Sequence, residues 1–300
     1  MILLTVVGYL IGAGFTDYAL RRGNDDDPLA PPRACAKIAD PSLLAARKPQ
    51  YSNEMWTIMS ADNLKLAATY FAPTEPSHRW AVLVHGYGRD QSFTGDYAEE
   101  YLKRGYNVLT PDLRAAGASE GEYLTMGTKE SEDIALWTRK IAEVDPQAQI
   151  VLHGVSMGAA TVMMTTAQAM QNVVAAVEDC GYTSAYDMFT AQLNVLFGLP
   201  EFPVMPCVDI VTRLKTGAAV SEAKPLDAVV HTAVPMLFIH GDADKLVPCA
   251  MAHELYEASN APAKELFIVE GAGHADAKNV NPQIYFERIF AFLRPYVDAD

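Results

Sequence analysis

The sequence predicts an α/β protein with a doubly wound, mostly parallel sheet. Short apolar runs recur along residues 51–300, and each is followed by a segment of helix length. The chain has 300 residues, of which 50% are hydrophobic and 20% are charged, so it can bury a large core. The same composition excludes an intrinsically disordered chain, and we expect one α/β domain with an insertion.

An antiparallel hairpin is the first element expected in this domain, because two apolar runs at 55–59 and 64–71 flank a turn at 61–63. Alternation of strands with helices then predicts parallel strands joined by right-handed crossovers. The apolar runs expected to form these strands are Trp80–Val84, Tyr106–Leu109, Ile150–Leu152, Val173–Val177, Met236–Ile239 and Glu265–Val269.

The alternation fails between about residues 183 and 234, where we predict a small helical lid over the sheet edge. Helix-like segments at Ser184–Phe197 and Val208–Leu214 flank three prolines, Pro200, Pro203 and Pro206. Phe189, Leu193 and Phe197 form an apolar stripe at helical spacing. Such a stripe is typical of core packing, and as a lid it would favour a short to medium acyl chain.

Residues 1–20 are apolar enough to suggest a membrane anchor or a signal segment, since about 20 helical residues span roughly 30 Å. An uncleaved anchor is favoured over a signal because the basic n-region is missing. The alternative is a buried N-terminal helix. Residues 21–50 are expected to be a linker or surface strap. A membrane-anchored or secreted protein follows, with a cytoplasmic location as the alternative and the orientation of the anchor open.

The net charge argues against a nucleic-acid partner, and the cysteine spacing argues against a metal site. The 37 acidic residues outnumber the 23 basic ones, and the net charge of −14 makes nucleic acid an improbable partner. The four cysteines include no CxxC pair, so no metal site is expected. They could pair completely in three ways, but free and mostly buried thiols are favoured.

A GxSxG motif at residues 154–158 provides the candidate nucleophile, Ser156. It follows the strand Ile150–Leu152 and precedes the helix-compatible run Ala159–Met164. A nucleophile elbow needs a strand, a tight turn and a helix in this order. The alternative is an ordinary Gly-Ser turn.

A serine nucleophile needs a base and an orienting acid, and both are expected later in the chain. His274 lies in a glycine-rich loop after one predicted strand, and Asp244 lies in the loop after another. Asp244 is preferred as the acid over Asp242 and Asp179. Both loops leave the carboxyl edge of the sheet, where α/β proteins place their sites.

Backbone N–H groups are expected to form an oxyanion hole. One belongs to Met157, directly after the nucleophile, and the other to Tyr87 in the loop 85–88, which follows a predicted strand. His85 opens that loop, and we expect it to form hydrogen bonds within the loop rather than to act as the base.

Six motifs in this order, HGYG, PDLRAAGASEG, HGVSMGAAT, DCGYTS, HGDADKLVP and GAGHA, resemble those of the α/β-hydrolase superfamily. Roughly residues 51–296 take part. Within the superfamily the chain resembles bacterial serine hydrolases with an N-terminal membrane segment, esterase-like proteins of unassigned substrate. The resemblance implies an eight-stranded core and the triad Ser156, Asp244 and His274. The run 115–117, Ala-Ala-Gly, departs from the more usual Gly-His-Gly.

Hydrolysis of carboxylic esters through an acyl-Ser156 intermediate, without a cofactor, is the expected function. A peptidase or an acyl transferase could use the same triad, as could a cofactor-free haloperoxidase. Haloalkane dehalogenation is excluded because it needs an aspartate nucleophile. A membrane-tethered binding protein without catalytic activity is the alternative of a different class.

Overall fold

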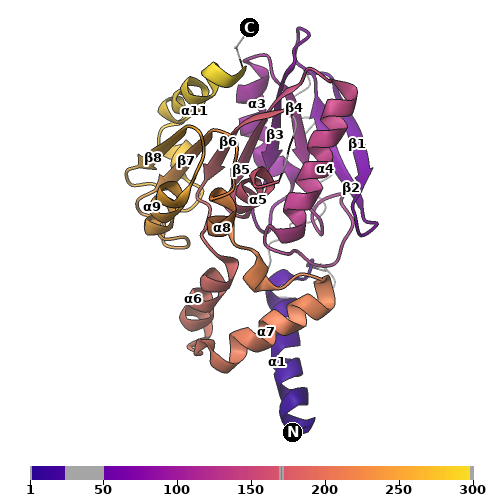
Figure 1. Cartoon of the computed structure of the whole chain (residues 1–300), viewed down its shortest axis with the longest axis vertical. Helices are drawn as coiled ribbons and strands as arrows, with labels where there is room; N and C mark the ends of the chain where they lie inside the picture. Colours follow the sequence, from indigo (N-terminus) through magenta and orange to yellow (C-terminus); the bar gives the residue numbers. More distant parts are fainter. Residues whose placement is uncertain (1, 24–50, 169, 171, 298–300) are drawn as a thin grey trace.

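The computed structural model describes residues 2–23, 51–168, 170 and 172–297, with the side chains of residues 2–5 left out. An eight-stranded sheet forms the centre of the protein (Figure 1). Its strands are β1 (Asn53–Met59), β2 (Lys65–Phe71), β3 (Arg79–Val84), β4 (Asn107–Pro111), β5 (Gln149–Val155), β6 (Val173–Asp179), β7 (Met236–Gly241) and β8 (Lys264–Val269).

The strand order β1-β2-β4-β3-β5-β6-β7-β8 confirms the predicted fold class. The predicted hairpin is β1–β2, which pairs antiparallel, and β2 also runs antiparallel to β4. All later pairs are parallel. The carboxyl ends of β3 and β5 to β8 therefore meet along one edge of the sheet.

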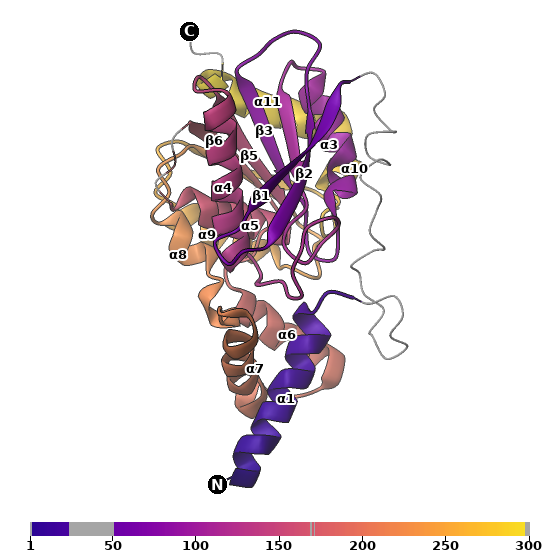
Figure 2. The same cartoon turned by 90° about the vertical axis from the view of Figure 1, so that its right-hand side faces the viewer.

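Helices cover both faces of the sheet (Figure 2). One face packs against α4 (Thr128–Val144), α5 (Met157–Thr166), α8 (Pro225–Val229) and α9 (Cys249–Ala258). The other packs against α3 (Gly95–Leu102), α10 (Ala277–Val280) and α11 (Pro282–Val297). In α4 the buried side chains Ile134, Trp137 and Ile141 recur at helical spacing. They therefore form one apolar face, which packs against the sheet. Two short 3₁₀ turns complete the domain, Gln91–Thr94 and Val220–Glu222.

The segment predicted as a lid contains α6 (Ala185–Phe197) and α7 (Glu201–Thr216), which lie beyond the sheet edge (Figure 1). Ser184 caps α6, with its side chain accepting a hydrogen bond from the backbone of Asp187. The second helix begins earlier than predicted, at Glu201 and not at Val208, so the proline-rich break between the two helices is shorter. Pro203 and Pro206 lie inside α7, after a kink at Phe202, because a proline in the first turns of a helix removes an N–H that has no partner there.

The expectation of a membrane-spanning helix over residues 1–20 is not met. Among the helices of the described residues, none is both long and apolar enough to cross a bilayer. The predicted linker lies mostly at residues 24–50, outside the described residues.

Helix α1 (Ile2–Leu20) packs against α7 instead, and the two lie side by side in both views (Figures 1 and 2). The side chains of Thr16 and Leu20 are fully buried. The hydroxyl groups of Thr16 and Thr212 share a buried hydrogen bond of 3.0 Å. The C-terminal half of α1 is thus part of the tertiary structure, as in the alternative of a buried N-terminal helix.

Candidate active site

Ser156 lies at a sharp turn between β5 and α5, at the carboxyl edge of the sheet. Its backbone is strained, with φ +57° and ψ −118°, a region that non-glycine residues seldom occupy. Gly158 permits the turn, since a Cβ atom there would lie 2.2 Å from the carbonyl oxygen of Val84. The local sequence therefore presents the Ser156 hydroxyl away from the sheet, as a nucleophile elbow does.

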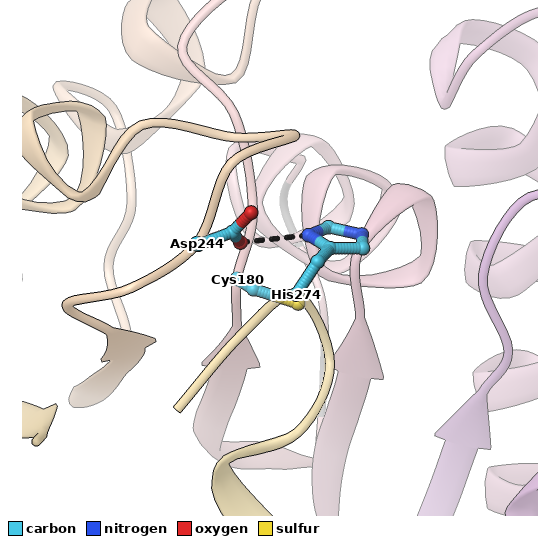
Figure 3. Close-up of side chains that lie close together, drawn as sticks. All are labelled: Cys180, Asp244 and His274. Carbon is cyan, nitrogen blue, oxygen red and sulfur yellow. Dashed lines mark hydrogen bonds and ion pairs between the residues drawn. The ribbon is translucent and has the colours of Figure 1, made fainter. Parts of the chain in front are cut away.

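His274 links Ser156 to Asp244. The Ser156 Oγ lies 2.8 Å from His274 Nε2, and His274 Nδ1 lies 2.7 Å from Asp244 Oδ2. Figure 3 shows the second of these contacts. Because a carboxylate only accepts hydrogen bonds, Nδ1 carries the proton, and Nε2 is left to accept from the serine. The three side chains come from the loops after β5, β7 and β8.

Asp244 is held as a carboxylate in a buried position. Its Oδ1 accepts hydrogen bonds from the backbone N–H groups of Leu246 (2.8 Å) and Val247 (2.9 Å). Burial on its own would raise the pKa of Asp244, but hydrogen bonds from His240 and His274 outweigh it and lower this pKa below its usual range. Asp244 is therefore ionised at neutral pH.

The two competing acids do not contact His274 through a hydrogen bond in the described residues. Asp242 is exposed and accepts from the backbone N–H of Gly271 at 2.7 Å. Asp179 is buried and accepts from the Tyr285 hydroxyl at 2.7 Å, and burial raises the pKa of Asp179 to about 6. Only Asp244 of the three is placed to orient the imidazole.

The predicted oxyanion donors lie beside the nucleophile. Met157 is the first residue of α5, where a backbone N–H has no acceptor within the helix. The loop carrying Tyr87 touches the elbow, because a Cβ at Gly86 would lie 3.3 Å from the Cβ of Ser156. His85 is buried and serves the loop as expected: its Nδ1 donates to the carbonyl of Gly86 at 2.9 Å, and its Nε2 accepts from Leu113 N–H at 3.0 Å.

An apolar cavity of about 380 Å³ adjoins Ser156. The predicted lid stripe lies in its wall, with Phe189, Leu193 and Phe197 all lining it. Helix α6 therefore carries this stripe over the nucleophile.

Comparisons with known proteins identify the family of this chain. Residues 81–287 match the model of the alpha/beta hydrolase family. The chain belongs to this family. The matched region contains the elbow, both oxyanion candidates and the other two members of the hydrogen-bonded chain.

This alpha/beta hydrolase is similar to the uncharacterized protein YqkD of Bacillus subtilis, at 26% identity over 81% of this chain and 80% of YqkD. Among solved structures it is similar to the esterase Pf2001 of Pyrococcus furiosus, with a TM-score of 0.70 and 25% identity over 89% of this chain and 97% of that one. It also shares its fold with the acylaminoacyl peptidase of Pyrococcus horikoshii, with a TM-score of 0.60 and 17% identity over 82% of this chain and 42% of the peptidase.

Two features of the hydrolase site are missing from the sequence-based predictions. Three residues of α1, Phe15, Tyr18 and Ala19, line the cavity, and no local motif marks them. His240 Nε2 lies 3.4 Å from Asp244 Oδ2 and donates to the carbonyl oxygen of Val247 at 2.9 Å. The position of His240 at the end of β7, four residues before Asp244, is a sequence signal that could have revealed this contact.

The thiol of Cys180 lies next to Asp244 and His274 (Figure 3). Cys180, Asp244 and His274 offer ligand atoms within 4.8 Å of one another, so these are the described residues that could hold a metal ion. Burial raises the pKa of Cys180 well above its usual value, which disfavours the thiolate that a metal requires. Cys207 and Cys249 are also free thiols, and Cys35 lies outside the described residues.

Glu178 beside this site predicts a pH-dependent stability. It is fully buried on β6, and burial raises its pKa from about 4.5 to about 8. The folded protein therefore retains a proton that the unfolded chain releases above about pH 4.5, so this group lowers stability as the pH rises towards 8.

We expect Glu178→Gln to remove that loss, because the amide oxygen can still accept from Gly181 N–H, which lies 3.0 Å from Glu178 Oε2. For a protein of this size, about 1 kcal/mol moves Tm by roughly 2–4 °C. We therefore expect the difference in Tm between the variant and the wild type to be at least about 3 °C more favourable to the variant at pH 8 than at pH 5. Thermal unfolding at both pH values measures this, and equal pH dependence in the two proteins would contradict it.

Proposed function

We propose that this protein is a serine hydrolase that cleaves carboxylic esters through an acyl-Ser156 intermediate. The observation that carries the proposal is the continuous hydrogen-bonded chain from Ser156 Oγ through His274 to the ionised Asp244. A hydroxyl becomes a useful nucleophile only when a base accepts its proton, and this geometry supplies that base.

In the proposed reaction, Ser156 Oγ attacks the ester carbonyl carbon while His274 Nε2 takes the hydroxyl proton. The backbone N–H groups of Tyr87 and Met157 stabilise the resulting oxyanion. The C–O bond to the alcohol then breaks, and the alcohol leaves with the proton from His274. A water molecule, deprotonated by His274, attacks the acyl-enzyme, and the carboxylic acid is released as Ser156 regains its proton. Asp244 orients the imidazole and stabilises its charged form.

Two further observations support an ester as the substrate. The cavity beside Ser156 is lined mostly by apolar side chains, which suits an acyl group. The similar structure of Pf2001 is described as that of an esterase. Peptidase and acyl-transferase activity remain the alternatives, since they would use the same three side chains.

Labelling with a fluorophosphonate tests the serine mechanism directly. We expect the reagent to modify Ser156, identified by mass spectrometry of the labelled peptide, and the protein to hydrolyse p-nitrophenyl acetate. Peptide anilides in the same assay separate an esterase from a peptidase. A protein that neither reacts with the fluorophosphonate nor hydrolyses any ester would be a non-catalytic binding protein, and the proposal would be wrong.

A further inference from the structure

Three helices lie beyond the sheet edge (Figure 2). Each of them contributes side chains to the wall of the cavity beside Ser156. Helices α6 and α7 belong to the predicted lid, but the third wall is the N-terminal helix α1. Its contributions are the side chains Phe15, Tyr18 and Ala19. Helix α1, which the sequence predicts to lie in a membrane, thus forms part of the cavity wall beside Ser156.

Aromatic contacts join α1 to the lid across this wall. The ring of Phe197, at the end of α6, lies 5.2 Å from that of Phe15 and 5.5 Å from that of Tyr18, both edge to face. This arrangement of aromatic pairs is favourable beyond the area it buries. The two helices therefore form one continuous apolar wall.

Polar contacts fix α1 in this position. Asp17 accepts a hydrogen bond from the Tyr123 hydroxyl at 2.8 Å and forms an ion pair with Lys215 of α7. The carbonyl of Leu20 accepts from Leu124 N–H at 2.9 Å. Together with the buried Thr16 contact to α7, these bonds tie the helix to both the lid and the main domain.

Helix α1 also contacts the loop that holds the proposed oxyanion donor. The hydroxyl of Tyr87 donates to the carbonyl oxygen of Ala19 at 2.6 Å. The Tyr87 backbone N–H is the expected donor, so the same helix that forms the cavity wall also supports the loop beside the reacting carbonyl.

The position of His274 shows which half of an ester would occupy the cavity. His274 must protonate the leaving alcohol, so the alcohol lies on the side of that imidazole. The cavity is lined by Ser156, Tyr87 and Met157 but not by His274. The acyl chain is therefore the part that extends between α1, α6 and α7.

We propose that α1 completes an acyl-chain site, and that the preferred substrates are esters whose alkyl acyl chain is several methylene groups longer than acetyl. The proposal rests on the proposed esterase function. A cavity of about 380 Å³ with mostly apolar walls has room for several methylene groups, and each one that is buried contributes about 0.8 kcal/mol. An acetyl group would leave most of this apolar space unfilled.

A matched pair of glycine variants on α1 tests the role of the helix. A Cβ at Gly12 would lie 2.4 Å from the carbonyl oxygen of Cys207, whereas a Cβ at Gly14 would meet no atom within 4 Å. Gly12→Ala should thus displace α1 from α7, and Gly14→Ala should not. The readout is the ratio of kcat/KM for p-nitrophenyl dodecanoate to that for the acetate.

We expect Gly12→Ala to lower this ratio at least about tenfold and Gly14→Ala to leave it within about twofold of the wild type. Filling the cavity with Ala19→Trp should also lower the ratio at least about tenfold, because each lost methylene contact changes the rate about fourfold at about 0.8 kcal/mol. Unchanged ratios in both Gly12→Ala and Ala19→Trp would overturn the proposal.

The wild-type protein provides a measurement that does not depend on the folding of any variant. Alkyl fluorophosphonates of rising chain length should label Ser156 at least about tenfold faster with a decyl chain than with an ethyl chain. Equal labelling rates would overturn the acyl-chain site while leaving the serine mechanism intact. No labelling by either reagent, together with no acetate hydrolysis, would instead contradict the proposed function itself.

Discussion

Replacing Ser156 with alanine is expected to lower kcat/KM for p-nitrophenyl esters by about four orders of magnitude or more, close to the background rate. The substitution removes the hydroxyl that would form the acyl-enzyme, and its Cβ keeps the backbone geometry of the elbow. The Tm and circular dichroism spectrum should match those of the wild type. Activity within tenfold of the wild type, in a folded variant, would rule out Ser156 as the nucleophile.

Ser156 Oγ lies 2.8 Å from His274 Nε2, so we expect a similar loss of activity when His274 is replaced. His274→Ala should cost a factor similar to that of Ser156→Ala, because neither group is useful without the other. The double variant should be no less active than either single variant. A much larger loss in the double variant would show that the two side chains act independently.

Asp244→Asn is expected to lower kcat by about four orders of magnitude, with little change in the fold. The asparagine side chain keeps the shape of the carboxylate but can place an N–H group towards His274 Nδ1. The imidazole would then carry its proton on Nε2 and could not accept one from Ser156. Loss of the negative charge also removes the stabilisation of the protonated imidazole.

Asp242→Asn is the matched control, since it makes the same chemical change two residues away in the same loop. Among the hydrogen bonds of the described residues, the Asp242 side chain accepts only from the backbone N–H of Gly271, so we expect kcat to change by less than about threefold. Kinetics of the two variants on one ester compare them directly. A larger effect at Asp242 than at Asp244 would move the orienting acid to Asp242.

Much of the fold and of the candidate site follows from local sequence patterns. The apolar runs predict eight strands close to their observed positions. The strands inside the sheet are predicted best, because a strand buried on both faces needs a continuous apolar segment. Gly154 to Gly158 predicts its turn because strand, turn and helix are all adjacent in the chain. The loops of Asp244 and His274 meet because parallel strands end at one edge of the sheet.

The proline-rich part of the lid shows where local patterns are insufficient. Pro203 and Pro206 suggested a break between helices, but a proline is compatible with the first turns of a helix, where its missing N–H has no acceptor. Whether α7 begins before or after them depends on what the segment packs against. Val204, Met205 and Val208 are buried against the rest of the molecule, and that packing supports the earlier start.

The sequence by itself determined the α/β fold class and brought a serine, an aspartate and a histidine to one edge of the sheet. Only the tertiary structure decided what α1 contacts and which carboxylate reaches His274. An apolar helix is equally suited to lipid and to another apolar helix, so its composition does not distinguish the two. Asp242 and Asp244 likewise differ by two positions in one loop, and backbone bonds from Leu246 and Val247 select the carboxylate that turns towards the imidazole.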